Sequence, residues 1–203
     1  MTKIKLCGLT RPCDVEAVNE LLPDFIGFVF ARNSRRYISP ENAAGLRKRL
    51  RPGISAVGVF TDEKPEAVAE LLSRGVIDIA QLHGGEEEAY IGRLRALTDK
   101  PVVKAFRIDE PRDIARAQNS TADYVLLDSG PGGTGTVFDW NLLRPMRRPY
   151  FLAGGLNAGN VKAAVEELAP YAVDVSSGIE TGGVKDIRKI REFVHAVRSV
   201  YSL

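Results

Sequence analysis

Short apolar runs recur along the chain, and each is followed by a polar or glycine-rich cluster and then by a segment with helical periodicity. Several runs, such as ISAVGVF and YVLL, show no alternation of polar and apolar positions, which is typical of strands that are covered on both faces. The pattern therefore predicts a parallel α/β fold with eight strands, at residues 4–7, 25–30, 54–60, 77–82, 101–106, 124–128, 150–153 and 172–176.

The segments between these runs carry signals for helix starts and ends. Ser39 stands before Pro40, which puts a cap residue ahead of a proline at the first helical position. Gly75 follows the helical pattern that begins at Pro65 and is a usual C-terminal stop. Further helices are predicted after Thr10 (CDVEAVNELL) and at residues 86–97, 111–118, 158–168 and 184–201, with a short one near 140–143.

The repeat of one strand and one helix takes roughly 25 residues, close to the minimum for a βα unit in a compact barrel. An open doubly wound sheet is the competing architecture, but it would carry one phosphate-binding glycine turn after its first strand. Here Gly8 alone follows the first run, and each of the last three runs is followed by a glycine pair. We therefore expect a single (β/α)8 TIM barrel, with a parallel eight-stranded core, over residues 1–203.

Composition narrows the possible partners and compartments. The net charge of +2 arises from bases scattered among acids, so we expect no nucleic-acid partner. No run is long enough to span a membrane, and the chain begins with a strand pattern rather than a signal peptide, so we expect no membrane association and a cytoplasmic location. Cys7 and Cys13 suit neither a disulfide framework nor a zinc site, and His195 lies on an amphipathic helix, so no metal is expected.

Two glycine turns suggest a phosphate site. Gly154 and Gly155 follow the seventh strand, and Ser176, Ser177 and Gly178 follow the eighth, with a short helical turn predicted at residues 179–180. In many barrels the loops after strands seven and eight offer backbone N–H groups to a phosphate. A phosphorylated small molecule is therefore the expected ligand.

Cys7 and Asp128 each end a predicted strand. A lone cysteine is usually a small buried hydrophobic residue, but a thiolate at the mouth of a barrel can also be a nucleophile, a ligand or a general base. A carboxylate at the end of a buried strand is either paired or functional. The loop at residues 129–135, after Asp128, is either a cover for the ligand or a surface turn.

Three further polar residues follow predicted strands. Arg35 and Arg36 come after the second strand, and an arginine fork suits a carboxylate or a phosphate, although one of the two is expected to be solvated. His83 comes after the fourth strand and is either part of the pocket wall or a polar contact at a helix start. Because all parallel strands deliver their carboxyl ends to one rim, these residues are expected to face one substrate.

Together these motifs resemble the phosphoribosylanthranilate isomerase family of tryptophan biosynthesis. Leu6 is a small departure, because isoleucine is commoner before the cysteine. The resemblance covers essentially the whole chain, in the order KLCG (5–8), GFVF (27–30) with SRRY (34–37), VGVF (57–60), QLHG (81–84), LDS (127–129) with GGTG (132–135), LAGGL (152–156) and DVSSG (174–178).

The resemblance implies an Amadori rearrangement of N-(5-phosphoribosyl)anthranilate that needs no cofactor. Asp128 would be the general acid and Cys7 the general base, so the acid must hold its proton near neutrality and the thiol must lose its own. Arg36 would bind the anthranilate carboxylate. The remaining residues expected to bind the substrate are His83, Asp174, Gly154, Gly155, Ser177 and Gly178.

Four alternatives stay open. The histidine-pathway isomerase resembles this chain but has an aspartate where Cys7 stands. Indole-glycerol-phosphate synthase would need a catalytic lysine, for which Lys104 is the candidate, and a sugar-phosphate epimerase would need metal-binding histidines. The last is a phosphate-binding barrel without catalytic activity. The assembly is expected to be a monomer or a homodimer.

Overall fold

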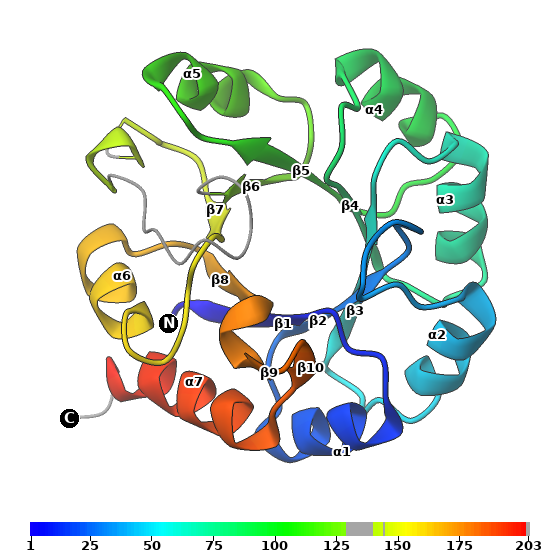
Figure 1. Ribbon diagram of the computed structural model, residues 1–203. Coiled ribbons are helices and arrows are strands. Elements are labelled where there is room, and N and C mark those ends of the chain that lie inside the picture. Colours follow the sequence, from blue (N-terminus) through cyan, green and yellow to red (C-terminus); the bar gives the residue numbers. More distant parts are fainter. Residues whose placement is uncertain (129–139, 144, 202–203) are drawn as a thin grey trace.

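The computed structural model describes residues 1–128, 140–143 and 145–201, and it shows a closed barrel of parallel strands. Figure 1 looks along the barrel axis, with the strands forming the inner ring and the helices lying outside it. Each strand pairs with the next in chain order, and the eighth closes the ring by pairing with the first. The strands are β1 (Lys3–Cys7), β2 (Phe25–Val29), β3 (Ser55–Phe60), β4 (Ile79–Leu82), β5 (Val102–Arg107), β6 (Tyr124–Asp128), β7 (Tyr150–Leu152) and β8 (Ala172–Val175).

The helices cover the outside of the barrel and confirm the predicted alternation. Ser39 caps its helix as predicted, because its hydroxyl accepts a hydrogen bond from the backbone N–H of Asn42. The helices are α1 (Pro12–Leu21), α2 (Pro40–Arg47), α3 (Pro65–Ser73), α4 (Glu88–Arg95), α5 (Pro111–Asn119), η1 (Trp140–Leu143), α6 (Val161–Leu168), η2 (Ser177–Ile179) and α7 (Ile187–Ser199). The prediction of a (β/α)8 barrel is therefore correct.

The predicted helix at residues 184–201 is wrong at its start. Val184 and Lys185 form a two-residue strand, β10 (Val184–Lys185), that pairs antiparallel with β9 (Glu180–Thr181). Gly182 and Gly183 make the turn between them at φ values of 59° and 80°, which glycine adopts without strain. The helix begins only after Asp186, whose carboxylate accepts hydrogen bonds from the backbone N–H groups of Arg188 and Lys189 in the first turn of the helix.

The predicted helical turn at residues 179–180 is also displaced, because η2 covers Ser177–Ile179 and Glu180 already belongs to β9.

Alternate strand residues point into the barrel and fill its amino-terminal half with apolar side chains. The cluster there contains Val57 of β3, Leu126 of β6 and Phe151 of β7, with Phe25, Ile79, Val103, Ala105, Ala153 and Ala172. On these strands the next inward position lies two residues further on, toward the carboxyl end. The apolar cluster therefore forms a floor, and polar strand-end residues lie above it.

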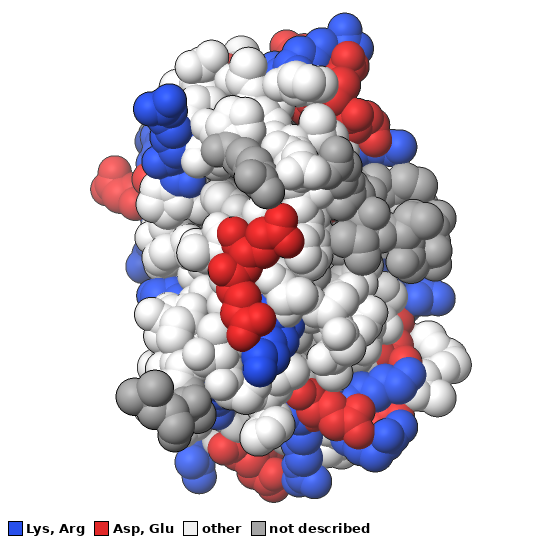
Figure 2. Space-filling model, turned by 90° about the vertical axis from the view of Figure 1, so that its left-hand side faces the viewer, with Lys and Arg blue, Asp and Glu red and all other residues white. Residues whose placement is uncertain are grey.

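The outer surface carries mixed charges where Figure 2 shows it. On the side of α6, acidic and basic side chains are both present, and uncharged residues cover most of the area between them (Figure 2).

The termini lie close together, because the Tyr201 hydroxyl accepts a hydrogen bond of 2.9 Å from the Thr2 backbone N–H. Among the helices in the described ranges, none is both long enough and apolar enough to cross a bilayer.

Candidate active site

A cavity of about 290 Å³ lies at the carboxyl ends of the strands. Its wall brings together side chains from the first, fourth, sixth and eighth strand units, with the loops after β2 and β7. Most of the predicted site residues line it, namely Cys7, Arg36, His83, Asp128, Gly154, Gly155, Asp174 and Ser177. Gly178 does not line it. The loop at residues 129–135, predicted as a cover or a turn, lies outside the described residues.

Cys7 ends β1 and is 7% exposed, and it packs with Val29 of β2 and Val59 of β3. Gly27 of β2 is its register partner, and a Cβ there would lie 2.6 Å from the Cys7 Sγ. A glycine at position 27 is therefore what leaves room for the thiol. Burial raises the pKa of the Cys7 thiol above its ordinary value, although the positive charges of Lys5 and Lys185 act to lower it.

Lys5, which the sequence analysis did not single out, lies beneath Cys7 on the same strand. Its side chain is fully buried, and its Nζ donates a hydrogen bond of 2.7 Å to Asp174 Oδ2 on β8. Burial alone would lower the pKa of Lys5, but the charges of Asp174 and Cys7 outweigh burial and raise it. The ammonium is therefore held in its charged form, and Asp174 Oδ1 has no hydrogen-bond partner among the described residues.

Asp128 ends β6 and belongs to the same cavity wall as Cys7. Its Oδ2 lies 3.4 Å from His83 Nε2, and its buried Oδ1 has no hydrogen-bond partner within the described part of the chain. His83 Nδ1 lies 2.9 Å from Gln81 Nε2, which fixes the ring from its other side. His83 is thus part of the pocket wall, which decides between its two predicted roles.

The loops after β7 and β8 touch each other. Gly154 and Gly155 have φ values of 90° and 61°, so their backbone turns in a way that other residues rarely adopt. A Cβ on Gly178 would lie 1.9 Å from the carbonyl oxygen of Leu156. Gly178 is therefore needed for the packing of the two loops behind the cavity, whereas Ser177 lines the cavity itself.

Arg36 is held by Glu180, a residue that sequence reasoning missed. Its Nε and Nη2 donate to the two carboxylate oxygens of Glu180 at 2.6 and 3.0 Å. Lys185 Nζ donates to the same carboxylate at 2.7 Å, and Arg35, whose side chain is 60% exposed, donates at 2.9 Å. Burial opposes the charge of Glu180, but Arg36 and Lys185 outweigh it and lower the pKa of the carboxyl.

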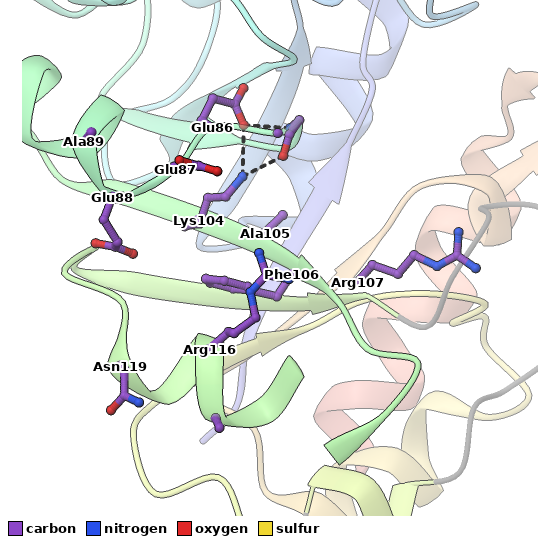
Figure 3. Close-up of a pocket in the computed structure, with 13 residues that line it drawn as sticks. Glu86, Glu87, Glu88, Ala89, Lys104, Ala105, Phe106, Arg107, Arg116 and Asn119 are labelled. Atoms are coloured by element: carbon purple, nitrogen blue, oxygen red, sulfur yellow. Dashed lines mark hydrogen bonds and ion pairs between the residues drawn. The ribbon is translucent and has the colours of Figure 1, made fainter. Parts of the chain in front are cut away.

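Lys104, the candidate for a catalytic lysine, faces away from this cavity. It lines a separate hollow of about 730 Å³ beside α4 and α5, where its Nζ donates to Glu86 Oε2 at 2.9 Å and to the Gly84 carbonyl at 2.7 Å (Figure 3). His195 is exposed on α7 and Cys13 is partly buried on α1, so neither joins the site. Within the described ranges no three His, Cys, Asp or Glu side chains are grouped to hold a metal ion.

Comparisons with known proteins agree with this geometry. The sequence model of the family described as "N-(5'phosphoribosyl)anthranilate (PRA) isomerase" matches residues 4–196. The N-(5'-phosphoribosyl)anthranilate isomerase of Endomicrobium trichonymphae is 48% identical over 204 residues, which cover 98% of this chain and all of that protein.

Solved structures give the same result. The crystal structure of phosphoribosyl anthranilate isomerase from Thermotoga maritima matches with a TM-score of 0.91 and 38% identity, over 98% of this chain and 100% of that one. A phosphoribosyl anthranilate isomerase in complex with reduced 1-(o-carboxyphenylamino)-1-deoxyribulose 5-phosphate matches with a TM-score of 0.88 and 36% identity, with the same coverage. The chain belongs to the N-(5'-phosphoribosyl)anthranilate isomerase family.

Proposed function

We propose that Cys7 and Asp128 are the base and the acid of the Amadori rearrangement that this isomerase catalyses. The reaction converts N-(5-phosphoribosyl)anthranilate to 1-(2-carboxyphenylamino)-1-deoxyribulose 5-phosphate in tryptophan biosynthesis. The observation that carries the assignment is that a thiol from the first strand and a carboxylate from the sixth line one cavity. A general acid and a general base must both reach the same small substrate.

In the first step Asp128 donates a proton to the ring oxygen of the ribose. The C1–O bond breaks, and the nitrogen lone pair forms the C=N bond of a protonated Schiff base. The unpartnered Oδ1 of Asp128 supports this role, because it is a buried oxygen directed at no other described residue. His83 Nε2, 3.4 Å from Oδ2, contacts the other oxygen of the carboxyl group.

In the second step the Cys7 thiolate removes the proton from C2 of the open chain. The C2–H electrons form the C1=C2 bond, the C=N electrons return to nitrogen, and the resulting enolamine tautomerises to the ketone. The electron sink is the substrate's own nitrogen, so the proposal requires no cofactor. The thiol is buried against Val29 and Val59, which keeps bulk water from competing for the proton.

Binding at the two ends of the substrate would fix it against these groups. We assign the phosphate to the backbone of the loops that carry Gly154, Gly155 and Ser177, with Gly178 packing behind them. Arg36 is assigned to the anthranilate carboxylate, with Glu180 holding two of its N–H groups and leaving Nη1 for the ligand. His83 and Asp174 line the cavity between these ends and are assigned to the sugar.

Turnover of the substrate, followed by its anthranilate fluorescence, tests the roles. Each general acid or base typically contributes about a hundred- to ten-thousandfold, so Cys7→Ala and Asp128→Asn are expected to lower kcat by such factors while substrate still binds. Cys13→Ser is the matched control, because this cysteine lies on α1 outside the cavity. Near-normal turnover in either variant would remove that residue from its role, and complementation of a tryptophan auxotroph checks the result in cells.

The same assay separates the alternatives. A barrel without catalytic activity would bind the phosphorylated ligand and turn over nothing. Lys104 faces another hollow, which argues against the lysine chemistry of indole-glycerol-phosphate synthase. The assembly, a monomer or a homodimer, remains a prediction. The structure of one relative, from Thermotoga maritima, is of monomers generated from a dimeric enzyme. Analytical ultracentrifugation would determine the oligomeric state of this chain.

A further inference from the structure

We propose that Lys5 is a positioning residue for the reaction, whose buried ammonium stabilises the thiolate form of Cys7. The inference rests on the proposed role of Cys7 as the base and adds the group that makes that role possible. Lys5 is part of the KLCG element that carries the family resemblance, but the sequence assigns it no role, because it lies inside a strand rather than at its end.

The first argument is the place of Lys5 in the barrel. On β3, β6 and β7 the inward residue two positions before the cavity is apolar, as with Val57 below Val59 and Leu126 below Asp128. On β1 the same position, two residues before Cys7, is occupied by Lys5, with no exposed surface. A buried ammonium in an otherwise apolar floor is costly unless it is paired, so a charge here needs a reason.

The second argument is the balance of charges around the thiol. Lys5 from β1 and Lys185 from β10 favour the thiolate, whereas burial and Asp174 from β8 oppose it. Asp128, His83 and Arg36 line the same cavity from the β6, β4 and β2 units. Lys5 precedes Cys7 by two residues on β1, so both side chains lie on the inner face of the same strand, and the charge of Lys5 acts to lower the pKa of the thiol.

The third argument is the number of partners of the ammonium. An ammonium has three N–H donors. One of them binds Asp174 Oδ2 at 2.7 Å, and the other two make no further hydrogen bond to the residues that the structure describes. The ion pair with Asp174 therefore leaves donors of the ammonium available to the thiolate of Cys7, which follows on the same face of β1.

The experiment measures the pKa of Cys7 directly. In a Cys13→Ser background Cys7 is the one remaining thiol of the two in the sequence, and its alkylation rate with iodoacetamide as a function of pH reports its ionisation. Lys5→Met keeps the side-chain length and removes the charge. Because an opposite charge within a few ångströms shifts a pKa by about one to three units, we expect Lys5→Met to raise the thiol pKa by that amount. The pKa of the catalytic base in the pH profile of kcat/KM should rise by the same amount.

Lys104→Met is the matched control. Lys104 is also buried and paired, at 2.9 Å from Glu86, but it faces a different hollow. Its replacement should lower stability and leave the Cys7 pKa where it was. A Lys5→Met protein with an unchanged thiol pKa would overturn the proposal, as would an equal shift in Lys104→Met.

Asp174→Asn keeps the proposal testable if Lys5→Met does not fold. Removing this carboxylate takes away a negative charge and leaves the ammonium, so the Cys7 pKa should fall, in the direction opposite to Lys5→Met. A rise, or no change, would contradict the charge balance. Alkylation does not depend on turnover, so Cys7→Ala retaining activity would reject the proposed base while leaving the measured effect of Lys5 intact.

Discussion

The Sγ of Cys7 lies 2.6 Å from the position that a Cβ would occupy at Gly27. The two residues are register partners on β1 and β2, and the Cα of Cys7 lies 3.1 Å from that same position. Contacts below 3 Å are too short for carbon and sulfur, so one of the two strands or the thiol itself would have to move. The missing side chain at position 27 thus sets the position of the proposed base.

Gly27→Ala is expected to lower turnover strongly, because the added methyl group displaces the thiol from the cavity. A misplacement of about 1 Å can cost about a hundredfold in rate. Steady-state kcat is the measurement. Gly45→Ala on α2 is the control, since a Cβ there meets nothing within 4 Å, and a helical Gly→Ala change typically stabilises by about 0.5–1 kcal/mol. A Gly27→Ala enzyme with normal kcat would contradict the steric argument.

Glu180→Gln is expected to raise KM by about tenfold or more, because Arg36 loses two charged hydrogen bonds that aim it at the cavity. The value of kcat should change much less, since neither residue touches the reacting atoms. Arg35→Ala is the matched control: it binds the same carboxylate, but its side chain is mostly exposed, so a small effect is expected. Equal effects of the two variants would show that Glu180 does not act through Arg36.

Gly178→Ala is expected to weaken substrate binding at its phosphate end. The new Cβ would fall 1.9 Å from the Leu156 carbonyl oxygen, which pushes the loops after β7 and β8 apart. Isothermal titration with inorganic phosphate and the KM of the substrate report the loss. Gly92→Ala on α4, where nothing lies within 4 Å, should leave both unchanged. Phosphate binding as tight as in the wild type would mean that these loops are not the phosphate site.

Acid should remove the stabilising effect of the Glu86–Lys104 pair. Burial opposes the charge of Glu86, but hydrogen bonds from Lys104 and from backbone N–H groups outweigh it and lower the pKa of the carboxyl below 4.5. A carboxyl group whose pKa is lowered by folding stabilises the protein at pH values above its ordinary pKa. This stability is lost as the pH falls through the pKa of the folded state. The pair should therefore stabilise at pH 7 and progressively less below about pH 4.5.

Glu86→Gln tests this by denaturant unfolding at several pH values. At pH 7 the variant should be less stable by about 3 kcal/mol, because a buried ammonium loses its carboxylate. The gap to the wild type should narrow as the pH falls below 4.5, the ordinary pKa of the carboxyl. Glu192→Gln, which breaks an exposed pair with Arg188, should change stability by less than about 0.5 kcal/mol. A gap that stays constant with pH would exclude ionisation of Glu86 as the cause.

The barrel and most of the site could be predicted because parallel strands repeat a simple pattern and end at one rim. Cys7, Asp128 and Gly154 are strand-end residues, so the fold alone brings them together. Lys5 and Glu180 could not be found in this way. Lys5 interrupts an apolar strand in a manner that usually indicates an edge or a surface. Glu180 binds Arg36, which lies 144 residues away in the sequence.

The start of the last helix was missed for a local reason. Val184 and Lys185 continue the periodicity of the helix that follows, so the pattern predicts a helix that begins at residue 184. The stronger signals were Gly182–Gly183, a pair suited to a hairpin turn, and Asp186, a good cap residue. The hairpin matters for function, because it brings Glu180 and Lys185 to the site.

The ion pair between β1 and β8 also bears on how the chain is made. During synthesis the first strand leaves the ribosome with its lysine and its cysteine, but the carboxylate that pairs with the lysine follows 169 residues later. Until then the nascent chain holds an ammonium that no closed barrel can bury. The final strand therefore completes the ring of hydrogen bonds and the charge pair at once, so a chain that stops before it would have neither.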